Sequence, residues 1–175
     1  MAFNVNNFRS ALPGGGARAN LFEVRIPNPA GLSGLPDVQK NIRLLCQTAS
    51  IPTGTIEQTE LNYFGRVYKI AGTRTFEDWE VGIYNDTDFS SRNAIEQWMA
   101  DIVPLDSSIG PVGYDYMVDR ATVSQMSRDD SIIATYEFFN MWPKSIGAIE
   151  LDTAGGEEVE TFTTTFAYSH FERTL

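Results

Sequence analysis

The stretch Lys69–Asn85, KIAGTRTFEDWEVGIYN, decides the fold that we predict for this chain. Its Ala71–Thr73 segment favours a turn, because the central glycine adopts positive φ angles at no steric cost. Apolar and other side chains then alternate, with Trp79, Val81 and Ile83 on one side against Asp78, Glu80 and Gly82. This period of two is typical of a strand with one buried face. We expect the rest of the chain to be arranged around this strand and the helix that follows it.

The helix is expected from about Asp88 to Ile102. Asn85–Asp88 supplies capping side chains, and Asp88 in the first turn suits the helix dipole. An apolar stripe follows with the spacing i, i+3, i+4, i+7, formed by Ile95, Trp98, Met99 and Ile102. We expect Phe89 to extend this stripe. The strand and the helix together predict six core anchors: Trp79, Val81, Ile83, Ile95, Trp98 and Met99.

The other segments favour strands and lack alternation of strands with helices. The expected strands are Ala19–Ile26, Ile42–Ala49, Thr55–Phe64 and Val67–Ile70 as a long polar hairpin that turns at Phe64–Arg66, Ala121–Met126, Ile132–Met141 ended by Trp142-Pro143, Ile149–Asp152 before a Gly155-Gly156 turn, and Glu158–Phe171 as the longest. The last strand has Thr161, Thr163 and Thr165 on one face and Phe162, Phe166 and Tyr168 on the other, which indicates one wet side and one core side. We predict a mostly β fold, an antiparallel β-sandwich or barrel with one flanking α-helix.

Two parts are expected along the chain. Residues 1–16 are predicted to form an N-terminal arm with a glycine-rich hinge, and residues 17–175 a single β domain. Phe3–Leu12 could form a short helix that Pro13–Gly16 ends, and a frayed terminus is the alternative. The length of 175 residues and the hydrophobic share of 42% suit one domain with its own core.

Composition and motifs argue against an enzyme or a metalloprotein. The formal net charge of −10 disfavours tight binding to nucleic acid, which depends on cationic contacts with phosphates. Cys46 is the only cysteine, so no intrachain disulfide forms, and with the single histidine His170 it cannot complete a structural zinc site. No phosphate-binding or nucleophile motif is present. We predict no catalytic residue, no metal, no cofactor and no membrane segment.

Four blocks of sequence resemble the tail tube protein of contractile-tailed bacteriophages. They are AxxNLFEVRIP at Ala17–Pro27, IAGTRTFEDWEVGIYND at Ile70–Asp86, FFNMWPKSIGAIELD at Phe138–Asp152 and VETFTTTFAY at Val159–Tyr168. Their order and spacing, with the amphipathic helix between them, are also similar to that family and cover most of the chain. The G-x-RTF-x-DW pattern and the WP-x-x-(I/V)-G pattern are the most specific parts.

The resemblance implies a structural virion protein that is assembled in the host cytoplasm. In the family, hexameric rings stack into a hollow tube, and sheets of neighbouring subunits join into one continuous inner β-barrel. The implied partners are other copies of the chain, the tail sheath protein, baseplate and tail terminator proteins, and double-stranded DNA that passes through the lumen without specific binding. A tube subunit of a tailocin or of another contractile injection system is one alternative. A monomeric ligand-binding β-sandwich is the alternative from a different class, although the polar strand faces argue against the apolar pocket that it requires.

Within such a tube, we expect an acidic, hydroxyl-rich lumen that repels DNA phosphates. The candidate lumen residues are Thr161, Thr163, Thr165, Glu57, Glu60 and Glu137, although the acids could instead serve solubility or contacts between subunits. The polar face of the helix, with Arg92, Glu96 and Asp101, is expected to face the sheath. The Ile51–Tyr68 region and the N-terminal arm are expected to contact stacked rings, because both pack poorly within one subunit.

Overall fold

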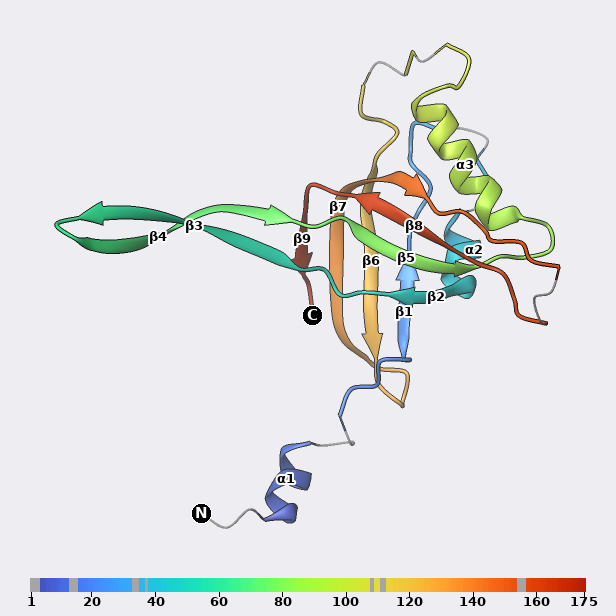
Figure 1. Cartoon of the computed structure of the whole chain (residues 1–175). Helices are drawn as coiled ribbons and strands as arrows, with labels where there is room; N and C mark the ends of the chain where they lie inside the picture. The colour runs from blue at the N-terminus through green and yellow to red at the C-terminus, as the bar shows by residue number, and fades with distance from the viewer. Residues whose placement is uncertain are drawn as a thin grey trace.

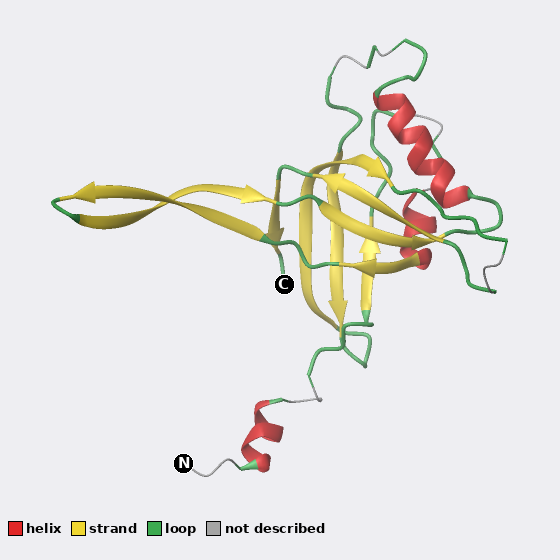
Figure 2. Cartoon of the chain, viewed as in Figure 1, coloured by secondary structure: helices red, strands yellow, loops and turns green. Residues whose placement is uncertain are grey.

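The computed structural model describes residues 4–12, 16–32, 35–36, 38–107, 109–110, 113–153 and 157–175, apart from the side chains of residues 39 and 41. Three helices and nine strands lie in these ranges (Figure 1, Figure 2). The helices are α1 (Val5–Ala11), α2 (Val38–Leu45) and α3 (Ser90–Ile102). The strands are β1 (Phe22–Arg25), β2 (Cys46–Ala49), β3 (Gly54–Tyr63), β4 (Arg66–Phe76), β5 (Trp79–Tyr84), β6 (Val118–Met126), β7 (Ile132–Ile146), β8 (Thr161–Ala167) and β9 (His170–Arg173).

Seven strands form two antiparallel sheets that share the long strand β7. The first sheet contains β1, β6, the N-terminal half of β7 and β9. The second sheet contains β2, β5, β8 and the C-terminal half of β7. Between the two halves of β7, Asn140 has a φ of 54°, a left-handed conformation that asparagine tolerates better than most residues.

The prediction that Trp142-Pro143 ends this strand is wrong. β7 continues to Ile146, and Pro143 lies opposite Phe166 of β8. Proline lacks an N–H group, but a strand at the edge of a sheet tolerates it because only one side of the strand is paired. The outer position of β7 in the second sheet therefore explains why the strand crosses the proline.

The core lies between the two sheets and is closed by α2 and α3. Trp79 of β5 packs against Phe138 of the first sheet, with ring centroids 4.4 Å apart. The ring centroids of Trp98 in α3 and Phe166 are 6.3 Å apart. The largest fully buried side chains are Trp79, Trp98, Phe138, Phe166, Ile26, Ile42, Ile83, Ile95, Met141, Val24, Val38 and Val81. The mostly antiparallel β fold with a flanking helix is confirmed.

The segment predicted as a strand at Ile42–Ala49 is a helix for its first part. α2 occupies Val38–Leu45, and only Cys46–Ala49 forms β2. Val38 and Ile42 are fully buried one helical turn apart, and the backbone N–H of Val38 donates to Oδ1 of Asn28 at 3.0 Å. This cap comes from a residue ten positions away, so local alternation did not indicate it.

The hairpin is longer than predicted. The turn expected at Ala71–Thr73 is absent, because β4 runs without interruption from Arg66 to Phe76. The chain reverses at Phe64 and Gly65, within the predicted Phe64–Arg66 turn, with φ angles of 46° and 77°. Two consecutive positive φ angles match the twist of an antiparallel pair, which accounts for a tight connection there.

Two predictions near the C-terminus are also wrong. Ile149–Asp152 forms no strand, and the Gly155-Gly156 turn lies outside the described residues. The strand expected at Glu158–Phe171 divides into β8, which pairs with β5 and β7, and β9, which returns to pair with β7. Each half contributes to a different sheet, a tertiary choice that the residue pattern did not indicate. The longest strand is β7.

α3 begins at Ser90, and the hydroxyl group of Ser90 donates a hydrogen bond to the carboxylate of Asp86. Phe89 precedes the helix with a φ of 52° and is 42% exposed, so the prediction that it extends the apolar stripe is wrong. Asp88 lies before the first turn and not within it.

The N-terminal helix is shorter than the segment predicted for it. α1 covers Val5–Ala11 and buries none of its residues. Phe3 and residues 13–15 of the predicted hinge lie outside the described residues. The division into an arm at 1–16 and a domain at 17–175 stays a prediction.

Candidate functional site

The outward side of the second sheet carries polar side chains, and we call it the polar face. Its members lie opposite one another across four strands: Gly82 faces both Thr48 and Thr163, while Thr165 faces both Glu80 and Ser145. The alternate residues of these strands point into the core, where Val81 and Phe166 are fully buried. The sheet therefore separates an apolar interior from a hydroxyl-rich surface.

Gly82 is required at its place on the polar face. A Cβ atom on Gly82 would lie 2.3 Å from Oγ1 of Thr48, well inside van der Waals contact. The absence of a side chain lets Thr48 cover the backbone of β5, so Gly82 is buried although it points outward. This contact joins the short strand β2 to the rest of the sheet.

The charged groups on and beside the polar face are mostly acidic. Glu80 is exposed, and the carboxylate of Asp78 accepts a hydrogen bond from the ammonium group of Lys144. Burial, followed by the nearby carboxylates of Asp78 and Glu77, raises the pKa of Tyr168 above its ordinary value. The face therefore offers hydroxyl groups and carboxylates, and the ammonium group named here, that of Lys144, is paired with Asp78.

Both outer edges of the second sheet are available for pairing. Among the described residues, no strand pairs with the outer side of β2 or with the outer side of the C-terminal half of β7. Unpaired edges promote association with another chain unless they are covered. The sheet is therefore open at both ends in the single subunit.

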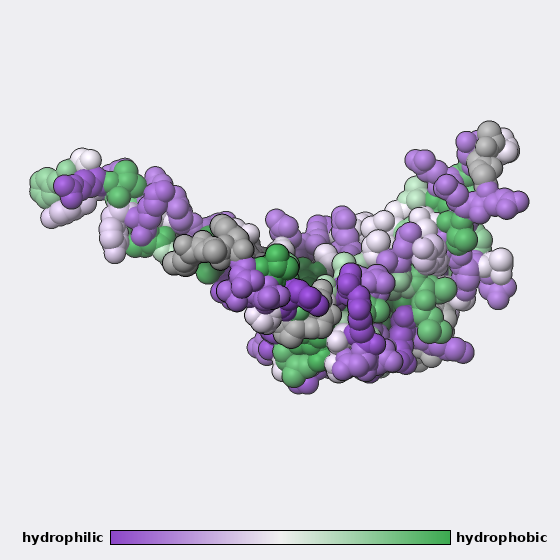
Figure 3. Space-filling view, turned by 90° about the horizontal axis from the view of Figure 1, so that it is seen from below, coloured by the Kyte–Doolittle hydropathy of each residue, from purple (hydrophilic) through white to green (hydrophobic). Residues whose placement is uncertain are grey.

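The β3–β4 hairpin forms a second exposed surface, and it extends well beyond the two sheets (Figure 1). Phe76, at its base, packs against Phe171 with ring centroids 5.5 Å apart. The space-filling view shows hydrophobic residues at the outer end of the hairpin (Figure 3). Both strands are exposed along almost their entire length, so the hairpin has little support from its own subunit.

Strand pairing sorts the hairpin side chains into two faces. Leu61 lies opposite Tyr68, and these two residues share one face with Tyr63 and Ile70. These four side chains are between 40% and 71% exposed, and Phe64 at the turn is 89% exposed. The other face carries the Glu60–Lys69 ion pair at 3.7 Å. The hairpin is polar in overall composition, but these apolar side chains share one face or lie at the tip, while Val67 lies on the face of the ion pair.

The structure brings only some of the predicted lumen residues together. Thr161, Thr163 and Thr165 lie in a row on the outward side of β8. Glu57 and Glu60 are exposed on the hairpin, away from that row. Glu137 lies on the first sheet, opposite Thr122 and 3.9 Å from Arg120. The threonines and the three acids thus occupy three different surfaces.

The predicted core anchors lie together beneath the polar face. Met99 is half-buried against the core cluster. The other five are at most 1% exposed: Trp79, Val81, Ile83, Ile95 and Trp98. The indole N–H of Trp79 donates to the carbonyl oxygen of Ser50 at 2.7 Å, and that of Trp98 donates to Tyr116 at 2.8 Å. Each tryptophan therefore satisfies its polar atom while filling the core.

The residues predicted to face the sheath differ from one another. Arg92 is largely covered: it donates to the carbonyl oxygen of Gly147 at 2.9 Å and to Glu96 at 2.7 Å, and it lies over the ring of Phe162. This arginine holds α3 to the segment after β7. Glu96 is exposed and Asp101 is half-buried on the same helix.

Sequence reasoning missed Thr48 and Ser145 as members of the polar face. Thr48 follows a helix that looked like a strand, and Ser145 follows the proline that seemed to end β7. Only the strand pairing identifies them. The alternation around Trp79 did place Glu80 on the outward side, although Glu80 was not among the lumen candidates.

Metal and membrane features are not found in the described ranges. Those residues contain no group of three or more His, Cys, Asp or Glu side chains arranged to hold a metal ion. No helix there is both long and apolar enough to cross a membrane.

Comparison with known proteins assigns the family. The family model described as "Phage tail tube protein" matches residues 17–174. The chain belongs to the phage tail tube protein family. It is a structural component of the virion and not an enzyme, as the sequence predicted. Tail tube protein gp19 of Enterobacteria phage T4 is 29% identical over 158 residues, which cover 89% of this chain and 91% of that protein.

Solved structures show the same fold beyond the phage proteins. A chain of the sheath-tube complex of PVC, an extracellular contractile injection system, has a TM-score of 0.60 at 10% identity. The match covers 99% of this chain and 99% of that one. The Hcp1 protein from an E. coli pathovar has a TM-score of 0.51 at 9% identity, with 89% of this chain and 92% of that one covered. Tail tube proteins and these subunits therefore share the two-sheet architecture described above.

Proposed function

We propose that this tail tube protein assembles into hexameric rings through the outer edges of its second sheet, and that the rings stack into the hollow tube of a contractile tail. The second sheet carries the proposal. Its inner face is packed in the core, its outer face is polar, and neither outer edge has a partner strand among the described residues. Pairing between copies would cover both edges at once.

The strand directions favour such a closure. β2, β5, β8 and β7 are antiparallel in succession, so β2 and β7 run in opposite directions. Rotation about a ring axis preserves the direction of each strand along that axis. β2 of one copy would therefore meet β7 of the next in antiparallel orientation, and the sheets would join into one antiparallel barrel.

In that barrel, the polar face would line the channel. The core side of each sheet is occupied by its own subunit, so the face with Thr161, Thr163 and Thr165 is the one left for the lumen. Hydroxyl groups and carboxylates offer no cationic contacts to phosphates, and such contacts are the main source of affinity for DNA. Double-stranded DNA would thus pass without specific binding.

α3 would then face outward, toward the sheath. Its buried side chains, including Ile95 and Trp98, meet the core side of the second sheet, opposite the polar face. Glu96 and Asp101 belong to the surface that we assign to sheath contact, while Arg92 supports it from below. The PVC relative comes from a sheath-tube complex, which supports a sheath as partner. Baseplate and terminator proteins would meet the two ends of the tube.

A crosslink tests the ring. Thr48 and Ser145 are exposed on the polar face at the two outer strands, so cysteines at both positions would meet across a joined edge. In a Cys46→Ser background, Thr48→Cys/Ser145→Cys is expected to give a ladder of oxidised species that ends at the ring size. Either single cysteine variant serves as the control and is expected to stop at the dimer. Monomers throughout, with no rings in negative-stain electron microscopy, would contradict the proposal.

A charge change tests the lumen. Phage particles assembled with Thr163→Lys/Thr165→Lys are expected to form tails of normal length but to eject DNA more slowly, because lysines would bind the passing phosphates. Thr163→Ser/Thr165→Ser is the matched control. Unchanged ejection kinetics in the lysine variant would contradict the proposal that DNA passes along this face.

A further inference from the structure

The tip of the β3–β4 hairpin combines exposed aromatic side chains with a positive charge. Tyr63 and Phe64 pack edge to face with ring centroids 4.5 Å apart, and they are 71% and 89% exposed. Arg66 follows directly, and in the described part of the chain it has no acidic partner. Lys69, the next cation, is already paired with Glu60. The tip is therefore an apolar knob with one unpaired cation.

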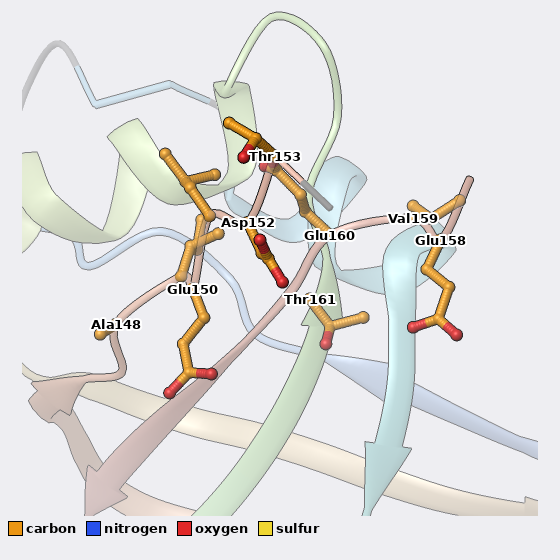
Figure 4. A pocket seen from close by; sticks show the side chains of 10 residues that line it. Ala148, Glu150, Asp152, Thr153, Glu158, Val159, Glu160 and Thr161 are labelled. Atoms are coloured by element: carbon orange, nitrogen blue, oxygen red, sulfur yellow. The ribbon is translucent and has the colours of Figure 1, made fainter. Parts of the chain in front are cut away.

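A hollow of 760 Å³ lies in the segments between β7 and β8 (Figure 4). Its lining carries four acids together with apolar side chains, and no lysine or arginine is among the lining residues. Leu151 and Val159 are 80% and 64% exposed there, and Glu150 and Glu158 are exposed as well. Glu160 is bound to the side-chain amide of Asn85 at 2.9 Å. The hollow thus joins uncovered apolar surface to a strong negative charge.

The hairpin and the hollow lie at opposite ends of the subunit. The hairpin leaves the body along the direction of the second-sheet strands, and the described segments 147–153 and 157–160 lie at the other end (Figure 1). When copies are placed in a row along this direction, the hairpin of each copy points at the hollow of the next. When copies of a chain associate through two different patches, the array of copies grows without limit unless a rotation closes it into a ring. Such open growth suits the stacking of rings.

We propose that the hairpin tip of one subunit docks in the acidic hollow of a subunit in the next ring. This inference rests on the proposed tube and adds the surface that receives the hairpin. Phe64 and Tyr63 would cover Leu151 and Val159, and Arg66 would lie among the carboxylates of Glu150 and Glu158. The contact would cover the exposed apolar side chains at the tip and in the hollow, and it would give Arg66 an acidic partner at the ring junction.

A second concave surface, which is apolar, suits the tip less well. It lies between α3 and β7 and includes Met99, Ile102 and Trp142. Its only acid, Glu96, is already bound to Arg92 at 2.7 Å. Arg66 would find no free carboxylate there. Charge complementarity therefore favours the hollow between β7 and β8.

A charge exchange tests the contact. Arg66→Glu alone, and Glu150→Lys/Glu158→Lys alone, are each expected to raise the protein concentration needed for tube growth by about tenfold, since like charges would meet at the junction. All three substitutions together are expected to restore growth. Arg74→Glu, at the base of the hairpin, is the matched control and is expected to leave growth unchanged. Restoration is the expected result; growth that stays impaired in the combined variant overturns the inference.

A crosslink identifies the receiving surface directly. In the Cys46→Ser background, Phe64→Cys/Leu151→Cys is expected to give an open ladder that continues beyond the ring size. Phe64→Cys/Leu105→Cys, which places the second cysteine beside α3 at a residue 96% exposed, is the control and is expected to crosslink poorly. A stronger ladder from this control pair would place the hairpin at α3 and overturn the inference.

These outcomes separate this contact from the tube itself. If the charge variants still give the closed ladder of Thr48→Cys/Ser145→Cys, rings form and only stacking is lost, as expected. If the wild-type chain gives neither ladder and no rings, the proposed tube fails first. If wild-type tubes form while the Phe64–Leu151 pair stays unlinked under oxidation, the tube stands and the docking inference is wrong.

Discussion

Gly82→Ala tests whether the close approach of Thr48 to Gly82 holds the edge of the second sheet. The new Cβ would lie 2.3 Å from Oγ1 and 3.6 Å from Cβ of Thr48. Only the hydroxyl is therefore in conflict, and it can move by rotation of Thr48 about χ1 or by displacement of β2. The substitution leaves the rest of the polar face unchanged.

The expected loss follows from these distances. An off-rotamer side chain costs about 0.5–1.5 kcal/mol, and overpacking in a well-packed site costs about 1–3 kcal/mol. The reduced freedom of the unfolded chain on replacing glycine returns about 0.4–1 kcal/mol. We expect a net loss of about 1–2 kcal/mol in the free energy of unfolding, equivalent to a fall of roughly 3–6 °C in Tm for a chain of this length.

The appropriate assay is urea unfolding at protein concentrations below those that support assembly, because assembly adds to apparent stability by mass action. Gly82→Ala/Thr48→Ala should return to the stability of Thr48→Ala alone or exceed it, since the conflicting hydroxyl is removed. Gly82→Ala/Thr163→Ala is the matched control, because Thr163 faces Gly82 from the other side without the short contact. Wild-type stability in Gly82→Ala, or equal rescue by both second substitutions, would refute the reasoning.

Three further predictions concern other parts of the fold. Asn140→Gly should preserve stability while Asn140→Val should lose about 1–2 kcal/mol in the free energy of unfolding, because a φ of 54° strains a branched residue; chemical denaturation checks this. Burial raises the pKa of Glu23, but hydrogen bonds from Arg25 and Arg43 outweigh it and hold the pKa below its ordinary value. The stability from Glu23 should therefore be complete above the ordinary pKa of 4.5 and be lost as pH falls through the lowered value, so Glu23→Gln should flatten the acid limb of a stability–pH curve. Burial raises the pKa of Cys46 to about 11, so its thiol should react with a maleimide at pH 8 far more slowly in the folded chain than in urea; equal rates would contradict this.

Features that depend on neighbours along the chain could be predicted from the sequence. Alternation in a strand follows from covalent geometry, so the pattern around Trp79 and that around Phe162 correctly separated buried from outward residues. The stripe of Ile95 and Trp98 indicated α3 for the same reason, through its own period. Gly65 marked the true hairpin turn, because its positive φ is a local requirement.

The tertiary structure decided what depends on residues far apart in the chain. α2 starts where the side chain of Asn28 caps Val38, and β7 passes Pro143 because that strand lies at an edge. The polar face exists only when β2, β5, β8 and β7 are placed in register, and the hairpin and the hollow face opposite ways only in the folded subunit. Local pattern fixes which side of a strand is apolar, but the free energy that selects partners, edges and ends comes from contacts that sequence spacing does not encode.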